Sequence, residues 1–279
     1  MTSHYFTNRE TSMYKYDGLV IHQSHDDDGI LEVVEQQGVR SLHFGSYPKQ
    51  SSQLLSDPDR LYLDYARAMT SWLLFKQSPN HNLIVGLGGG SLAKHLLHHF
   101  PECRVRAVEY RKSVVKIARS HFGLPLDPHL KIIIADGGQY LRQHSESHSG
   151  HYDLLLIDAF DHEGLAQSIC SVAFFDACKA VLKPDGIMAI NLWGTDKTLF
   201  EQIALWLGRI FNWKILFLPV RDKGNIIGLA FNDNTPFYSM RELRERAAIL
   251  EQHYQIEFPS FLKDIKRHNS RLMGKMIKT

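Results

Sequence analysis

From residue 82 to residue 231, short apolar runs alternate along the chain with longer amphipathic segments. The apolar runs have the length and composition of strands, whereas the amphipathic segments repeat their apolar residues at helical spacing. The predicted strands are 82–85, 104–108, 130–135, 152–157, 187–192, 213–218 and 226–231, and the predicted helices are 91–100, 112–121, 138–144, 168–182 and 197–210. This alternation predicts an α/β fold with a doubly wound, Rossmann-like parallel sheet.

The chain before this region has a different pattern. Residues 18–22, 30–36 and 39–44 are β-rich runs, and Gln36-Gln37-Gly38 predicts a hairpin turn between the last two. Asp57-Pro58 predicts the start of an amphipathic helix that ends near residue 76. We therefore expect two parts: a small N-terminal β-rich region at 1–56, and a nucleoside-binding catalytic domain with C-terminal helices at 57–279.

Composition and charge narrow the class of protein. The 279 residues are 44% hydrophobic and 22% charged, as in globular proteins, and the net charge of +2 argues against a dedicated nucleic-acid binder. The polar N-terminus and the lack of a long apolar run predict neither a signal peptide nor a membrane helix. Three cysteines without paired spacing favour a reducing compartment, so we expect a cytoplasmic protein with no membrane or nucleic-acid partner.

The strongest chemical signal is a glycine-rich turn between a predicted strand and a predicted helix. Gly86, Gly88, Gly89 and Gly90 stand in the segment NLIVGLGGGSLAKHL. Glycines allow a tight turn and let backbone N–H groups approach a ligand closely. The pattern predicts a nucleoside-type ligand at this turn, and a tight turn without a ligand is the alternative.

Acidic residues follow the next strands at the end where ligands bind in open α/β sheets. Glu109 lies about 20 residues after the glycines, where a carboxylate would accept hydrogen bonds from ribose hydroxyls, unless it is simply a surface acid. Asp136, followed by Gly137, would accept from an adenine amino group, cap the next helix, or do both.

Asp158 and Asp161 lie on one short loop after the fourth strand of the alternating region. One carboxylate would accept a proton from an attacking amine, and the other would pair with a cationic part of the substrate. The alternatives for Asp158 are a helix cap or a buried hydrogen-bond acceptor.

The sequence predicts no metal site. The histidines at 95, 98 and 99 and those at 144, 148 and 151 have no acid or cysteine partner at metal spacing. The acidic run at 26–28 predicts a solvated turn, because no further ligands follow at calcium-loop spacing. Neither H-E-x-x-H, C-x-x-C nor G-x-S-x-G occurs, so hydrolase triads gain no support.

The ordered motifs GLGGGSLAKHL, AVEY, IIIADGGQYL, YDLLLIDAFDHEG and LKPDGIMAINLWG resemble the spermidine synthase (polyamine aminopropyltransferase) family over residues 40–232. The resemblance implies the class I S-adenosylmethionine-dependent methyltransferase fold, decarboxylated S-adenosylmethionine as co-substrate, an amine acceptor and a homodimer. It implies that Glu109 holds ribose, that Asp136 holds adenine and that Asp158 helps to deprotonate the amine. It also matches Gln50, Tyr62 and Asp161 to family site residues, and Asp64 would face a cationic acceptor.

Three departures from the family pattern leave the reaction open. Gly89 replaces the family acid that holds the amine of the decarboxylated donor, so this turn would also receive the carboxylate of intact S-adenosylmethionine. Residues 161–165 lack both family prolines. The loop 219–224 has Arg221 and Lys223 where the family has an aromatic residue, and these cations would repel a polyamine unless acids offset them.

Three hypotheses follow. The first is an aminopropyltransferase that uses decarboxylated S-adenosylmethionine, the second is a methyltransferase that uses S-adenosylmethionine in the same pocket, and the third is a non-catalytic nucleoside-binding homologue. All three predict a small-molecule ligand and no metal. Trp193, just past the fifth strand, would either line the acceptor site or pack in the core.

Overall fold

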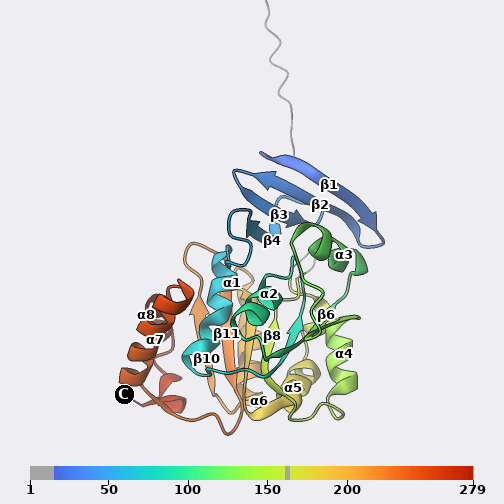
Figure 1. Ribbon diagram of the computed structural model, residues 1–279. Coiled ribbons are helices and arrows are strands. Elements are labelled where there is room, and N and C mark those ends of the chain that lie inside the picture. Colours follow the sequence, from blue (N-terminus) through green and yellow to red (C-terminus); the bar gives the residue numbers. More distant parts are fainter. Residues whose placement is uncertain (1–15, 161–163, 279) are drawn as a thin grey trace, which may run out of the picture.

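The computed structural model describes residues 16–160 and 164–278, and its centre is a seven-stranded sheet (Figure 1). All neighbouring strands run parallel except β11, which is antiparallel to both of its neighbours. In spatial order the strands are β10 (Ile215–Pro219), β11 (Asn225–Phe231), β9 (Leu182–Trp193), β8 (Tyr152–Ile157), β5 (His81–Val85), β6 (Arg104–Glu109) and β7 (Leu130–Ile134). The order reverses between β5 and β8, so the ends of these two strands form the switch point where such sheets bind ligands. The predicted doubly wound fold is confirmed.

Helices cover both faces of this sheet. In β8, Leu154 and Leu156 pack toward one face, whereas Leu155 and Ile157 pack toward the other. The first face is covered by α2 (Ser91–His99), α7 (Met240–Tyr254), α8 (Phe258–His268) and the 3₁₀ helix η1 (Met69–Leu74). The second face is covered by α4 (Gly137–His144), α5 (Val172–Val181) and α6 (Lys197–Ile210). Burial on both faces explains why the central strands are largely apolar.

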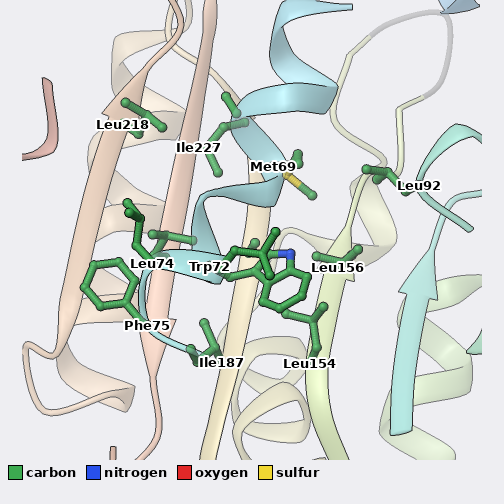
Figure 2. Packing of buried hydrophobic residues seen from close by; sticks show 14 of the residues in the cluster. Met69, Trp72, Leu74, Phe75, Leu92, Leu154, Leu156, Ile187, Leu218 and Ile227 are labelled. Atoms are coloured by element: carbon green, nitrogen blue, oxygen red, sulfur yellow. The ribbon is translucent and has the colours of Figure 1, made fainter. Parts of the chain in front are cut away.

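The core of the first face is centred on Trp72. Figure 2 shows its indole between the short helix η1 and the strands that carry Leu154, Leu156 and Ile187. Trp72 is fully buried, as are all six residues of η1. This packing fixes the segment before β5 against the sheet.

Four N-terminal strands form a separate antiparallel sheet at one end of the molecule (Figure 1). They are β1 (Leu19–Asp26), β2 (Gly29–Gln36), β3 (Val39–His43) and β4 (Lys49–Leu54). Leu31 and Leu42 of this sheet pack on Val114 and Ile117 of α3 (Lys112–His121). The sequence analysis did not predict β4, because KQSSQL shows no apolar alternation even though Ser51, Ser52 and Gln53 are buried.

One sequence-based expectation is wrong in this region, and a second holds only in part. Asp57 does not begin a helix: residues 57–60 form a turn, and α1 (Asp64–Ala68) starts after Leu63 and continues into η1. The reason is that η1 is buried on every side, so tertiary packing decides its geometry. The acidic run does form a turn in which Asp27 and Asp28 are exposed, as predicted, but Asp26 accepts from the Arg111 guanidinium at 2.5 Å.

Within the described ranges, no helix is both long enough and apolar enough to cross a membrane.

Candidate active site

The glycine-rich turn joins β5 to α2 at the switch point. Gly86, Gly88 and Gly90 have φ values of +90°, +54° and +82°, a region that side-chain-bearing residues rarely adopt. A Cβ on Gly86 would lie 2.1 Å from the Asp158 carbonyl oxygen. Glycine is therefore required both by the backbone conformation and by the close approach of β8. The predicted strand–turn–helix arrangement is present.

Glu109, at the end of β6, faces this turn. Its two carboxylate oxygens accept from the backbone N–H groups of Leu87 and Arg111, each at 2.9 Å. Burial raises the pKa of Glu109, and these N–H groups act in the opposite direction. A carboxylate has about four acceptor positions, so capacity remains for ribose hydroxyls. Glu109 is thus a buried acid that holds the glycine turn, not a surface acid.

Asp136 follows β7 and caps α4, because its Oδ1 accepts from the Gln139 backbone N–H at 2.6 Å. The helix-cap alternative is therefore correct, and the outward edge of the carboxylate remains open to a ligand. A Cβ on Gly137 would lie 2.2 Å from a Val85 methyl group, so this turn also packs tightly against β5. A cavity of about 460 Å³ begins beside Asp136 and runs along β6, β7 and α4.

Asp158 lies at the end of β8, directly beside Gly86. Its Oδ1 accepts from Asn191 Nδ2 at 3.0 Å, and the Tyr65 hydroxyl lies within hydrogen-bonding reach of the same carboxyl. Burial raises the pKa of Asp158 to about 6, although both hydrogen bonds lower it. Ser171 caps α5 instead. Of the alternatives for Asp158, the hydrogen-bond acceptor is the observed one, and its side chain is partly buried.

The surroundings of Asp158 include three residues that the sequence analysis missed. Asn225 Nδ2 on β11 donates to Asn191 Oδ1 on β9 at 3.0 Å. Two buried side-chain amides therefore form a hydrogen-bonded chain that ends at the Asp158 carboxyl. The Tyr65 hydroxyl also lies 3.3 Å from the Gln50 carbonyl oxygen. The only signal for the asparagines was a polar residue inside an apolar strand, and Tyr65 had the spacing of a core residue.

Of the predicted acceptor-side residues, Gln50 lies beside the glycine turn, whereas Tyr62 and Asp64 contact Arg67. Gln50 on β4 lies beside the glycine turn, with its carbonyl oxygen 3.8 Å from a Cβ built on Gly88. The carbonyl oxygen of Tyr62 accepts from the Arg67 guanidinium. Asp64 forms an ion pair with the same arginine at 2.7 Å. Asp161 lies outside the described residues.

Acids offset both cations of the 219–224 loop. Arg221 pairs with Asp264 of α8 at 2.8 Å, and Lys223 Nζ lies 4.0 Å from Asp64 Oδ2. The repulsion of a cationic acceptor that the sequence suggested is therefore reduced. Trp193 is 46% exposed, which removes the core alternative for this residue.

The space around Gly89 is already filled. A Cβ on Gly89 would lie 2.7 Å from Ser51 Oγ and 3.0 Å from the Phe122 ring. An acidic side chain at this position would require both neighbours to move. The departure from the family motif at Gly89 is therefore matched by its surroundings.

The described part of the chain contains no cluster of three or more His, Cys, Asp or Glu side chains that would hold a metal ion. Cys103 and Cys178 are buried free thiols.

Comparison with known proteins places this geometry in a family. Residues 64–202 match the model of the spermine/spermidine synthase domain. The chain is 34% identical to the polyamine aminopropyltransferase of Chromobacterium violaceum over 248 residues, which cover 88% of this chain and 93% of the relative. It is 35% identical over 239 residues to the enzyme of that name from Neisseria meningitidis serogroup A, with 85% and 89% covered.

Solved structures agree on the fold. A probable spermidine synthase from Corynebacterium glutamicum superposes with a TM-score of 0.70 at 19% identity, and 92% of this chain and 95% of that chain are covered. Human methyltransferase-like protein 13 in complex with SAH superposes with a TM-score of 0.63 at 26% identity, with 70% and 93% covered. The fold is therefore shared with both kinds of transferase, and the relatives at 34–35% identity are polyamine aminopropyltransferases. The chain belongs to the spermine/spermidine synthase family of polyamine aminopropyltransferases.

Proposed function

We propose that this protein transfers an aminopropyl group from decarboxylated S-adenosylmethionine to an amine and releases methylthioadenosine. The observation that carries the proposal is Asp158: a partly buried carboxyl at the switch point, next to the glycine turn, with a pKa raised to about 6. The family relatives support the same reaction.

The chemistry needs an unprotonated amine. The amine nitrogen forms a bond to the aminopropyl carbon beside the sulfonium, the carbon–sulfur bond breaks, and sulfur keeps the electron pair. The nitrogen then carries an extra proton, which must leave. A carboxylate with a pKa near 6 is largely ionised at neutral pH and is basic enough to take part in this proton transfer. The remaining rate enhancement would come from alignment of the nucleophile with the leaving group.

The residues at the other strand ends suit the nucleoside. We assign the ribose to Glu109 and the adenine to Asp136 with Gly137. Gly86, Gly88 and Gly90 have no side chains, so the donor would bind directly against their backbone. On the acceptor side we assign Gln50, Tyr62, Asp64 and Asp161. The ion pair of Asp64 with Arg67 leaves its second oxygen facing Lys223 at 4.0 Å, where a substrate ammonium would compete.

Methyl transfer is the second candidate, and Gly89 favours it. The Ser51 hydroxyl faces Gly89 and lies 3.4 Å from the Ser91 hydroxyl, so hydroxyl and backbone donors stand where the family has an acid. Such donors suit the carboxylate of intact S-adenosylmethionine better than a bare amine.

Calorimetric titration of the purified protein with each donor separates the candidates. Tighter binding of decarboxylated S-adenosylmethionine supports aminopropyl transfer, and tighter binding of the intact form supports methyl transfer. Methylthioadenosine is the control for the nucleoside pocket. Asp158→Asn tests the non-catalytic alternative, because a protein without catalysis would lose no turnover.

We further propose a cytoplasmic homodimer in which residues 1–56 form a unit of their own and residues 57–279 form the catalytic domain. The separate four-stranded sheet supports the division into two units, and the free thiols of Cys103 and Cys178 suit a reducing compartment. Size-exclusion chromatography with light scattering would measure the oligomeric state, and a monomeric mass would contradict the dimer.

A further inference from the structure

The cavity beside α4 carries positive charge that the proposed transfer reaction does not use. It begins at Asp136 and continues along β6 and β7 to a group of basic side chains, which are Arg106, Lys131, His144 and His148. Its volume of about 460 Å³ is in the range of small-molecule sites. We propose that the part of the cavity around Arg106 and Lys131, the basic end, binds a small organic phosphate at a site separate from the nucleoside site.

Two cations lie side by side at the basic end. Arg106 of β6 and Lys131 of β7 are register partners in the parallel sheet, and both line the cavity, so their side chains lie on the same face. Neighbouring strands are about 4.8 Å apart, so the two positive charges repel each other unless an anion lies between them. Among residues 16–160 and 164–278, no acidic side chain pairs with either cation.

The guanidinium of Arg106 is held at one nitrogen only. Its Nη1 donates to the hydroxyl oxygens of Tyr152 and Tyr140, at 2.7 and 3.3 Å, and to His148 Nε2 at 2.6 Å. Within the part of the chain that the structure describes, Nε and Nη2 have no hydrogen-bond partner. These two nitrogens carry the parallel N–H groups that bind an oxyanion through two hydrogen bonds.

The partners of Nη1 orient the guanidinium without neutralising it. Burial, reinforced by the charge of Arg106, lowers the pKa of His148, so its ring is neutral at pH 7. Because Nε2 faces the Arg106 donor, the ring proton is on Nδ1, which lies 3.1 Å from the Ser147 hydroxyl oxygen. Arg106 is half-buried and therefore keeps an uncompensated positive charge at the cavity wall.

The charge and the lining of the cavity favour a phosphate monoester over other anions. Such a group carries about −1.5 to −2 charges at pH 7 and three acceptor oxygens, which match one guanidinium edge and one ammonium. A monocarboxylate has a single charge. Ile133 and Ala135 of β7 line the cavity between the basic end and Asp136, so an apolar organic part has a surface to lie on. Asp136 would repel an anion at the other end.

Calorimetric titration with phenyl phosphate tests the proposal, with benzoate and inorganic phosphate as comparison ligands. The proteins are the wild type, Arg106→Gln, Lys131→Gln and the control Lys116→Gln, which changes an exposed lysine of α3 that does not line the cavity. The titrations are repeated with saturating methylthioadenosine. Histidine-ring NMR locates the probe, with the His148 signals identified by their loss in His148→Gln.

We expect phenyl phosphate to bind at a single saturable site, more tightly than benzoate or inorganic phosphate, and to shift the His148 ring signals. Lys131→Gln should weaken binding about three- to tenfold, because an exposed ammonium is partly screened. Arg106→Gln should weaken it about tenfold or more, because it removes the two-point contact. Lys116→Gln should bind like the wild type, and saturating methylthioadenosine should leave phenyl phosphate binding in place.

Equal affinity in the wild type, Arg106→Gln and Lys131→Gln would overturn the proposal. Displacement of phenyl phosphate by methylthioadenosine would also overturn it, because the probe would then occupy the nucleoside site. Weak binding that does not saturate, or that falls equally in Lys116→Gln, would mean a general charge effect only. If Arg106→Gln fails to fold, Lys131→Gln decides alone, because Lys131 is exposed.

Discussion

Asp158 shows how one side chain obtains its chemistry from neighbours far away in the sequence. The carboxyl itself lies where the end of a parallel strand predicts a ligand-binding residue. Its surroundings, however, come from distant parts of the chain: burial raises its pKa, and its Oδ1 accepts from the amide of Asn191, 33 positions later, at 3.0 Å. The acid–base property of the site is therefore a result of packing, and the local motif shows only its location.

Gly86 allows a prediction at the same scale. Gly86→Ala should lower the free energy of unfolding by several kcal/mol and weaken methylthioadenosine binding, because the new methyl group would meet the Asp158 carbonyl oxygen at 2.1 Å. Gly150→Ala is the matched control, since Gly150 also has a positive φ but a Cβ built on it would meet no described atom within 4 Å. Urea denaturation should show a loss of only about 1 kcal/mol for the control. Equal losses in the two variants would contradict the close approach of β5 and β8.

The elements of the large sheet were predictable because their signals are local. Strands buried on both faces must be apolar, and β5, β6 and β8 therefore stood out, as did the glycines and acids at their ends. The strand β4 did not stand out, because Ser51, Ser52 and Gln53 are buried polar residues that only tertiary structure explains. For the same reason the sequence located Asp158 but not Asn191, whose role depends on two neighbouring strands.

A histidine cluster between α2 and α7 gives a prediction about pH. Burial, reinforced by neighbouring histidines, lowers the pKa of His95 to about 3 and that of His99 to about 4. The unfolded chain, with histidine pKa values near 6.5, then binds more protons, so stability should fall as the pH drops below about 6.5. Urea midpoints measured from pH 7 to pH 4 should decline by an amount equivalent to a few kcal/mol.

His95→Leu is the informative variant for this cluster, because His95 Nε2 is buried with no hydrogen-bond partner among the residues that the structure describes. The variant should flatten the decline below pH 6.5. A matching substitution at the half-exposed His129, which lies elsewhere on the surface, should leave the slope unchanged. A slope that is the same in wild type and His95→Leu would show that other groups cause the acid sensitivity.

The loop between β10 and β11 carries a prediction about the acceptor. Lys223→Gln removes the cation that lies 4.0 Å from Asp64, so the KM for a diamine should fall about two- to fivefold at low salt. The effect should shrink at high salt, because the pair is exposed and screened. Steady-state kinetics at two salt concentrations measure it. Lys275→Gln, in the 3₁₀ helix Met273–Lys275, is the control cation, and an equal effect there would indicate a general charge effect.

At the scale of the whole molecule, hydrogen bonds of Arg111 link the N-terminal sheet to the proposed nucleoside site. Arg111 is 8% exposed and binds Asp26 of β1 through its guanidinium, while its backbone N–H donates to Glu109. Hydrogen bonds from Arg111 hold the pKa of Asp26 below its usual value, although burial acts in the opposite direction. Arg111 thus joins the small sheet to Glu109, the acid that accepts a hydrogen bond from the glycine-rich turn.

Asp26→Asn tests this connection. The variant leaves a largely buried guanidinium without its anionic partner, so we expect a loss of about 1–3 kcal/mol in stability and faster hydrogen exchange in β1 and β2. The affinity for methylthioadenosine should fall a few-fold. Asp28→Asn, in the same acidic turn, is the control. Unchanged exchange and affinity in Asp26→Asn would show that the two sheets act independently.

The most direct test of the central claim is the mass of the product. The protein is incubated with a diamine and equal amounts of intact and decarboxylated S-adenosylmethionine, and the acceptor and nucleoside products are identified by mass spectrometry. Our account predicts an acceptor that has gained an aminopropyl group, stoichiometric methylthioadenosine, and loss of both in Asp158→Asn. An acceptor that has gained a methyl group, with S-adenosylhomocysteine as the nucleoside product, would contradict it.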